Sequence, residues 1–196
     1  MNKRQETALK TKQKIIEAAD KLTKDKGFEN ITVDEIVQEA NVAKGTFYVY
    51  FKKKEDVISG IWKDELSNIQ SSSYDKNGSV EERISNFLIN STKYIVKNDL
   101  KVAQQWFRMT FEYKNTDGIK KIEFDKKSLT NIIEDSIDKK ELKKDIPVEQ
   151  ISEDLVATFY GYVIGWCMSD SKIDPVKSIK RYCKNTLPNI LKPYKK

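Results

Sequence analysis

Hydrophobic residues recur three or four positions apart along most of the chain, which is the spacing of amphipathic α-helices. In residues 8–26 this spacing places four apolar side chains on one face: Ile15, Ile16, Ala19 and Leu22. Gly27 follows directly, and glycine commonly ends a helix because it adopts the left-handed conformation at little steric cost. The pattern therefore predicts a helix that ends just before Gly27.

A second, shorter helix is predicted from the sequence ITVDEIVQEA. The Thr32 hydroxyl can accept a hydrogen bond from the backbone N–H of Glu35, and the Glu35 carboxylate can reach back to residue 32. Ile31 and Ile36 occupy the two positions of a hydrophobic staple around this capping box. We therefore expect a helix that begins at Val33.

The same spacing predicts helices along the rest of the chain. One begins near Val57, and later ones have apolar faces that start at Val80, Val102, Ile122 and residue 148. The long helix among them places four isoleucine and leucine residues inward: Ile122, Leu129, Ile133 and Ile137. The last helix begins at Asp174–Pro175, an N-cap followed by proline, and Pro188 ends or kinks it. We expect an all-α protein of about nine helices, with the polar stretch QSSSYDKNGS, residues 70–79, as a candidate domain boundary.

The composition is that of a soluble protein with one or two domains. The chain has 196 residues, of which 34% are charged and 38% hydrophobic. Its longest uncharged apolar run, residues 155–168, is too short to cross a bilayer and predicts a buried helix instead. The N-terminus is polar, and Cys167 and Cys183 form no CxxC pair, so we expect a cytoplasmic protein with packing thiols.

The sequence offers little for catalysis or metal binding. Histidine, the commonest general base and metal ligand, is absent. The nucleotide-binding glycine loops and the GxSxG nucleophile motif are also absent, and the acidic residues show only the spacing of solvated helix faces. We therefore expect no enzyme, no cofactor and no metal.

Positive charge is concentrated in three places, although the net charge is only +6. Residues 3–14 hold five basic side chains and one acidic side chain. Residues 42–54 hold four basic side chains and no acidic one, and residues 172–196 hold eight basic side chains and one acidic side chain. Focused positive charge is typical of surfaces that bind polyanions, although the C-terminal cluster could equally be a solvated end.

The basic stretch VAKGTFYVYFKKK, residues 42–54, has the composition of a helix that approaches DNA. Together with the two preceding helices it has the dimensions of a helix-turn-helix unit, in which the second short helix enters the major groove. Gly45 would let the backbone approach phosphate, which the free N–H groups at a helix N-terminus favour. Phe47 and Phe51 are expected to face the core, and Ala43 leaves the helix without a side-chain N-cap.

Residues 8–55 resemble the DNA-binding domain of the TetR family of bacterial transcriptional regulators. The matching string is IIEAADKLTKDKGFENITVDEIVQEANVAKGTFYVYFKKKEDV. The resemblance implies an all-helical homodimer with a DNA-binding domain, residues 1–55, and an effector-binding and dimerisation domain, residues 56–196. It also places seven residues at positions that usually contact DNA: Thr32, Lys44, Gly45, Thr46, Tyr48, Tyr50 and Lys54.

The C-terminal region is rich in aromatic residues, which suit a mostly apolar effector pocket. The pocket candidates are Phe87, Tyr94, Trp106, Phe107, Phe111, Phe159 and Tyr162. Each of them could equally be a plain core residue. Small residues also recur every fourth position in the helix expected over residues 148–169, which would allow close approach by a partner subunit or by a neighbouring helix. The resemblance implies that the last two helices form the dimer interface, and the candidates are Ala157, Gly161, Gly165, Ile179, Tyr182 and Leu187.

The favoured hypothesis is a ligand-responsive transcriptional repressor. A homodimer would bind a palindromic double-stranded operator, and a small apolar or aromatic effector would release it. An alternative is a DNA-binding regulator without a small-molecule effector, controlled by a partner or architectural in role. An enzyme with an accessory helix-turn-helix is disfavoured because histidine and catalytic motifs are absent. The sequence leaves the effector, the operator and the choice between repressor and activator open.

Overall fold

The computed structural model describes residues 3–57, 60, 77–97, 100–112 and 116–196. These residues are mostly helical, and no strand occurs among them beyond an isolated bridge between Leu142 and Lys195. This confirms the all-α prediction. Most of the polar stretch at 70–79, and most of the helix expected from Val57 onward, lies outside the described residues.

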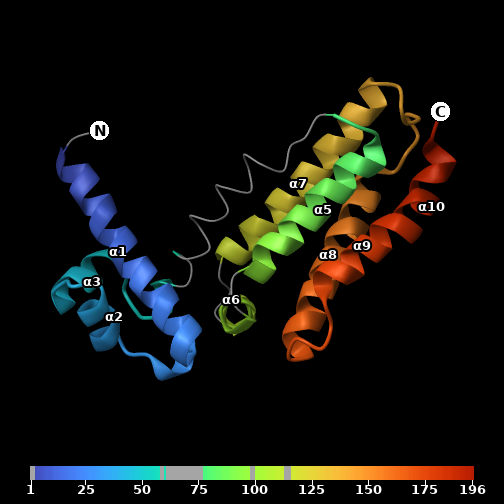
Figure 1. Ribbon diagram of the computed structural model, residues 1–196. Helices are drawn as coiled ribbons and strands as arrows, with labels where there is room; N and C mark the ends of the chain where they lie inside the picture. Colours follow the sequence, from blue (N-terminus) through green and yellow to red (C-terminus); the bar gives the residue numbers. More distant parts are fainter. Residues whose placement is uncertain (1–2, 58–59, 61–76, 98–99, 113–115) are drawn as a thin grey trace. The chain divides into compact units, whose positions relative to one another are not determined.

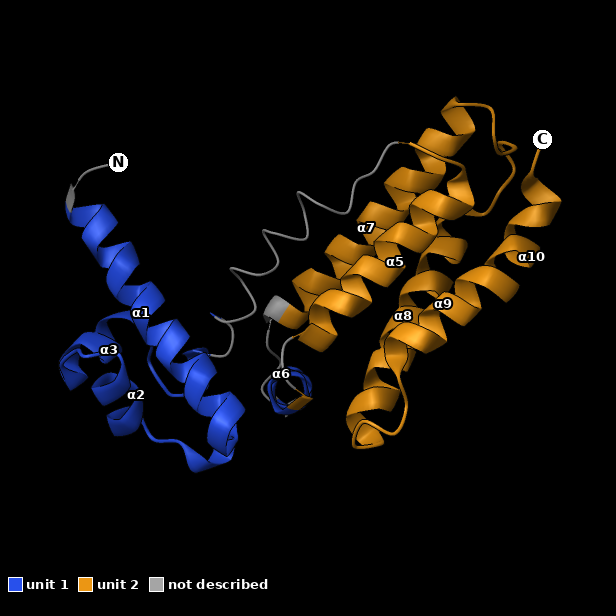
Figure 2. Cartoon of the chain, in the orientation of Figure 1, with its two compact units in different colours: residues 1–68, 101–115 blue, residues 69–100, 116–196 orange. Residues whose placement is uncertain are grey.

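The chain divides into two compact units (Figure 2). Unit 1 comprises residues 1–68 and 101–115, and unit 2 comprises residues 69–100 and 116–196. Unit 1 thus includes a segment from the middle of the chain, which the expected division after residue 55 does not contain. That division stays a prediction.

Unit 1 is built around a three-helix arrangement with one further helix. Its elements are α1 (Lys3–Lys26), the 3-10 helix η1 (Phe28–Asn30), α2 (Val33–Glu39), α3 (Lys44–Tyr50) and nearly all of α6 (Leu100–Glu112) (Figure 1). The helices α1, α2 and α3 pack against one another around buried side chains that include Ile15, Ile36 and Phe47. Gly27 has a φ of 80°, which confirms it as the stop of α1.

The predicted capping box fixes the start of α2. The backbone N–H of Glu35 donates to Thr32 Oγ1 at 3.2 Å, and the backbone N–H of Thr32 donates to the Glu35 carboxylate at 2.8 Å. Lys26 donates to the same carboxylate at 2.7 Å. The Lys26 ammonium and the Thr32 groups lower the pKa of Glu35 to about 2, so the carboxylate remains charged in moderately acidic solution.

Unit 2 contains a four-helix bundle with a C-terminal extension. Its elements are α5 (Val80–Lys97), α7 (Thr116–Asp138), α8 (Val148–Met168), α9 (Pro175–Asn185), α10 (Leu187–Leu191) and the 3-10 helix η2 (Lys192–Tyr194). Both α5 and α8 pack against α7 and α9, which closes the bundle around one core (Figure 1). The predicted start of α9 is confirmed, because the Asp174 carboxylate accepts a hydrogen bond from the Lys177 backbone N–H at 2.9 Å.

Buried polar groups tie the helices of unit 2 together. The Arg83 guanidinium on α5 is nearly inaccessible and donates to Asp135 at 2.8 Å, Ser136 at 2.7 Å and Glu141 at 2.9 Å. It thereby joins α5 to the end of α7 and to the turn that follows. Cys167 and Cys183 are also buried, and burial raises the pKa of both thiols, that of Cys167 to about 12, so both remain protonated packing groups at neutral pH.

The buried face of α7 differs from the prediction at its N-terminal end. Leu129 and Ile133 are buried as expected, but Ile122 is 41% exposed. Lys121 and Asp125 are buried instead, with exposures of 5% and 0%. The helix therefore presents positions 121, 125 and 129, one turn apart, to its neighbours, and this places Ile122 outside the bundle.

Candidate DNA-binding site

The short helix α3 has one face in the core of unit 1 and the opposite face in solvent. Phe47 is fully buried and Phe51 nearly so, with ring centroids 5.4 Å apart, which confirms that both face inward. The opposite face is open and consists of four residues: Lys44, Gly45, Tyr48 and Val49. Their spacing of i, i+1, i+4 and i+5 places them side by side on the helix, as a major-groove surface requires.

The start of α3 is uncapped and uncovered. Ala43 is its N-cap residue and provides no side-chain hydrogen bond, as the sequence indicated. A Cβ added at Gly45 would meet no atom within 4 Å, so the backbone there is open to an approaching group. Free N–H groups at an open helix N-terminus can donate to a phosphate oxygen.

Lys44 is held by an acidic neighbour in the free protein. Its ammonium lies 2.8 Å from a carboxylate oxygen of Asp34 on α2, and this carboxylate raises the pKa of Lys44. Both side chains are exposed, so the pair is accessible to solvent and salt. A phosphate that binds Lys44 must therefore compete with Asp34.

We expect Asp34→Asn to tighten binding to operator DNA by up to about fivefold at low salt, because the Lys44 ammonium is released and a charge that repels phosphate is lost. Fluorescence anisotropy with a labelled operator duplex would measure this. Glu39→Gln is the matched control, since it removes the same charge from the other end of α2, where Glu39 pairs with Lys21 at 2.6 Å. Equal effects of the two variants would contradict a specific role for Asp34.

The remaining predicted DNA contacts already have partners or are partly covered. Thr32 is exposed, but its hydroxyl takes part in the capping box. Thr46 and Tyr50 are half-buried. The Lys54 ammonium donates to two backbone carbonyl oxygens, those of Phe28 and Ile31. Contact between these residues and DNA stays a prediction.

Val49 is a candidate contact that the sequence analysis missed. Its side chain is 76% exposed, more than that of Tyr48 at 51%. The tyrosine hydroxyls pointed to Tyr48 and Tyr50 as contacts, but the helical spacing also places Val49 next to Tyr48 on the same surface. An exposed apolar side chain on such a helix can contact a thymine methyl group.

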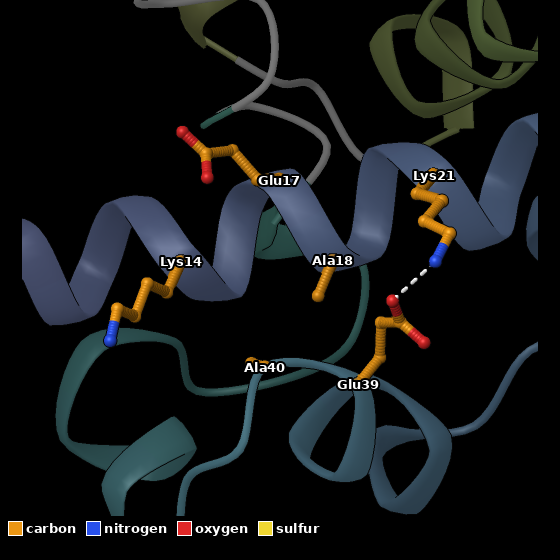
Figure 3. A pocket seen from close by; sticks show the side chains of 6 residues that line it. All are labelled: Lys14, Glu17, Ala18, Lys21, Glu39 and Ala40. Atoms are coloured by element: carbon orange, nitrogen blue, oxygen red, sulfur yellow. Dashed lines mark hydrogen bonds and ion pairs between the residues drawn. The ribbon is translucent and has the colours of Figure 1, made fainter.

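A pocket in unit 1 lies between α1 and α2 and not on the open face of α3. It has a volume of about 320 Å³ and is lined by Lys14, Glu17, Ala18, Lys21, Glu39 and Ala40. Figure 3 shows Ala18 directed toward α2, with the Lys21–Glu39 ion pair crossing from one helix to the other. The rim is charged and the floor consists of two alanines, so this pocket offers little apolar surface to an effector.

The predicted pocket residues are distributed over both units. Phe87, Tyr94, Phe159 and Tyr162 belong to unit 2, where Phe87 and Phe159 are buried and the other two are half-buried. Trp106, Phe107 and Phe111 lie on α6 and belong to unit 1; Trp106 and Phe107 are buried, whereas Phe111 is 68% exposed. Their role in binding an effector stays a prediction.

A buried polar cluster in unit 2 was not predicted. Lys121 donates to the carboxylate of Asp125 one turn along α7, and the Tyr160 hydroxyl on α8 donates to the same carboxylate at 2.8 Å. The Lys121 ammonium also lies 5.9 Å and 6.0 Å from the ring centroids of Phe124 and Phe159. Burial lowers the pKa of Lys121 and raises that of Tyr160. The cluster places a polar group among aromatic side chains.

The candidate interface residues separate into accessible and buried ones. Ala157 and Gly161 on α8 are exposed, and a Cβ at Gly161 would meet no atom within 4 Å. Gly165 is half-buried next to Ile173. Ile179, Tyr182 and Leu187 are buried in the core of unit 2, so their side chains pack within one chain and leave little area for a partner. The place of all six residues in a dimer interface stays a prediction.

Within the described ranges, no group of three or more acidic or cysteine side chains has an arrangement that could hold a metal ion. Among the same residues, no helix combines the length and the apolar composition that a membrane crossing requires.

Comparison with known proteins identifies the N-terminal region. The family model described as "Bacterial regulatory proteins, tetR family" matches residues 15–61. The fatty acid metabolism regulator protein of Bacillus subtilis is 25% identical over 169 residues, which cover 83% of this chain and 86% of that protein. The TetC protein of transposon Tn10 from Escherichia coli is 37% identical over 65 residues, which cover 33% of each chain.

Solved structures share the fold over both units. The fatty acid degradation regulator FadR from Bacillus halodurans superimposes with a TM-score of 0.70 at 21% identity, and the match covers 92% of this chain and 94% of that one. The regulatory protein TetR from Rhodobacter sphaeroides gives a TM-score of 0.64 at 18% identity, with coverages of 87% and 95%. The helix-turn-helix in unit 1 and the all-helical unit 2 together thus define a DNA-binding transcriptional regulator. Residues 15–61 thus form a DNA-binding domain of the TetR family type.

Proposed function

We propose that this protein is a ligand-responsive repressor that acts as a homodimer on a palindromic operator in the cytoplasm. The observation that carries the proposal is the open face of α3, where Lys44, Gly45 and Tyr48 lie opposite the buried Phe47. A symmetric dimer would place two such helices in successive major grooves, so its operator should be a pseudo-palindrome.

In vitro selection from random-sequence duplex DNA with the full-length protein tests DNA recognition. We expect a palindromic sequence to be enriched, and its affinity to fall steeply with salt because lysine–phosphate contacts release counterions. Transcription in vitro from a promoter that overlaps the selected site should then decrease as protein is added. Failure to enrich any sequence would contradict the proposal. Increased transcription would show that the protein is an activator and not a repressor.

The effector is proposed to have an apolar body with a polar group. The buried aromatics of unit 2 support the apolar part, and the Lys121–Asp125–Tyr160 cluster beside Phe159 supports the polar part. The name of the Bacillus subtilis relative suggests a fatty acid derivative as the first compound to test. Palmitate and palmitoyl-CoA should weaken operator binding at least about tenfold if either stabilises the released conformation. If neither palmitate nor palmitoyl-CoA changed the operator affinity, the result would favour a regulator that is not controlled by a fatty acid derivative.

The homodimer is proposed to use the open part of α8. Ala157 and Gly161 leave room for close approach by a second copy of this helix, so Gly161→Leu should convert dimer to monomer. Size-exclusion chromatography with light scattering would measure the mass. Lys127→Leu is the matched control, because it adds the same side chain to an exposed position on α7. A Gly161→Leu protein that remained a dimer would contradict this interface.

A further inference from the structure

The Lys54 ammonium is surrounded by groups of its own protein. It donates hydrogen bonds to the backbone carbonyl oxygens of Phe28 and Ile31, each at 2.9 Å. It also lies 4.5 Å from the centroid of the Phe28 ring, within the range of a cation–π interaction. The side chain is half-buried, so this ammonium has exchanged part of its water for two carbonyls and an aromatic face.

These contacts join two parts of the helix-turn-helix unit that are distant in sequence. Phe28 opens η1, and Ile31 directly precedes Thr32, the N-cap of α2. Lys54 follows the end of α3 by four residues. These contacts therefore fix the segment that follows α3 against the segment that leads into α2.

The residues after Lys54 are packed onto unit 1 as well. Val57 is fully buried. A Cβ added at Gly60 would lie 2.9 Å from the Cδ1 atom of Ile16 on α1, so the backbone at Gly60 approaches α1 closely. Lys54 and Gly60 thus both lie against the helix-turn-helix unit, and Val57 between them is buried.

We propose that Lys54 is a positioning residue for α3 and not a phosphate ligand. To reach a phosphate, the ammonium would leave both carbonyl oxygens, and the Phe28 and Ile31 carbonyls would lose a charged donor. The bond holds the exit of α3 at a fixed place relative to α2, and this sets the angle at which the open face of α3 meets DNA. The inference rests on the proposed sequence-specific DNA binding.

The salt dependence of operator binding distinguishes the two roles. Each lysine–phosphate contact contributes about 0.9 to the slope of log affinity against log salt, or about 1.8 for a symmetric dimer. We expect Lys54→Met to weaken binding to the selected operator and to leave this slope unchanged. Lys44→Met is the comparator, because Lys44 is exposed at the open end of α3 and its loss should reduce the slope. The Lys54→Met protein should also unfold at a midpoint lower by about 4–8 °C, since a charge-assisted bond is lost.

Lys54→Arg provides the second test. Arginine is at least as good a phosphate ligand as lysine, but its planar fork does not fit a site shaped for a point charge between two carbonyls. A positioning role predicts that Lys54→Arg binds the operator as weakly as Lys54→Met. A reduced slope in Lys54→Met, full affinity in Lys54→Arg, or an unchanged unfolding midpoint in Lys54→Met would overturn the inference. Failure of the wild-type protein to select any duplex is a separate result, which would remove the proposed function itself.

Discussion

Replacing Lys121 with methionine is expected to lower the free energy of unfolding by about 3–5 kcal/mol, because it leaves the Asp125 carboxylate buried without its counter-charge. Asp125 has no exposed surface, and its carboxylate also accepts a hydrogen bond from the hydroxyl of Tyr160. A neutral hydroxyl offsets only part of the desolvation of a carboxylate. Urea denaturation followed by circular dichroism would measure the loss in the transition of unit 2.

A combined variant separates the loss of the charge from the loss of packing. Lys121→Met with Asp125→Leu and Tyr160→Phe removes all three polar groups together, and we expect it to recover most of the stability, since apolar replacement of a buried ion pair is often neutral or stabilising. Lys126→Met is the matched control on the same helix. Lys126 pairs with Glu149 and Glu153 at the surface, and these carboxylates raise its pKa to about 12. Its replacement should shift the urea midpoint only slightly.

The result also bears on the proposed effector site. If the combined variant is as stable as the wild type but no longer responds to palmitate or palmitoyl-CoA, the cluster is retained for ligand binding and not for stability. A Lys121→Met protein as stable as the wild type would contradict the burial of the pair.

Local sequence signals predicted the helix-turn-helix unit well. The capping box of Thr32 and Glu35, the stop at Gly27 and the uncapped start at Ala43 depend on residues only a few positions apart, and all are present in the structure. The inward positions of Phe47 and Phe51 follow from their spacing of four. These features required no knowledge of distant contacts.

The features that were missed depend on packing between distant segments. Lys121 and Asp125 stand in the charged run KKIEFDKK, which has the composition of a solvated helix face, and only the contact with Tyr160 on α8 makes them a core cluster. Lys54 follows a basic stretch that is typical of phosphate binding, yet its ammonium meets carbonyls more than twenty residues earlier in the chain. Periodicity defines a helical face but not the rotation that its neighbours impose.

Substitutions at two adjacent residues of α3 should affect different properties, stability at Phe47 and DNA binding at Tyr48. Phe47→Ala should lower the free energy of unfolding by about 3–5 kcal/mol, because Phe47 is fully buried between the helices of unit 1. Operator binding should be lost with it, since α3 loses its anchor in the core. Phe47→Leu is the matched control, as it keeps an apolar side chain in the same place and should retain most of the stability and binding.

Tyr48→Ala should instead weaken operator binding by about tenfold and change the free energy of unfolding by only about 0.5 kcal/mol. Half of the Tyr48 side chain is exposed on the open face of α3, where its ring meets the edge of Phe47 at a centroid distance of 5.4 Å. Anisotropy titrations and urea denaturation on the same preparations would measure both quantities. A Tyr48→Ala protein that folds and binds the operator with full affinity would contradict this surface, because the position would then affect neither the core nor the DNA. The adjacent pair thus tests whether α3 is a recognition helix, with one side chain holding it in the domain and the next meeting the groove.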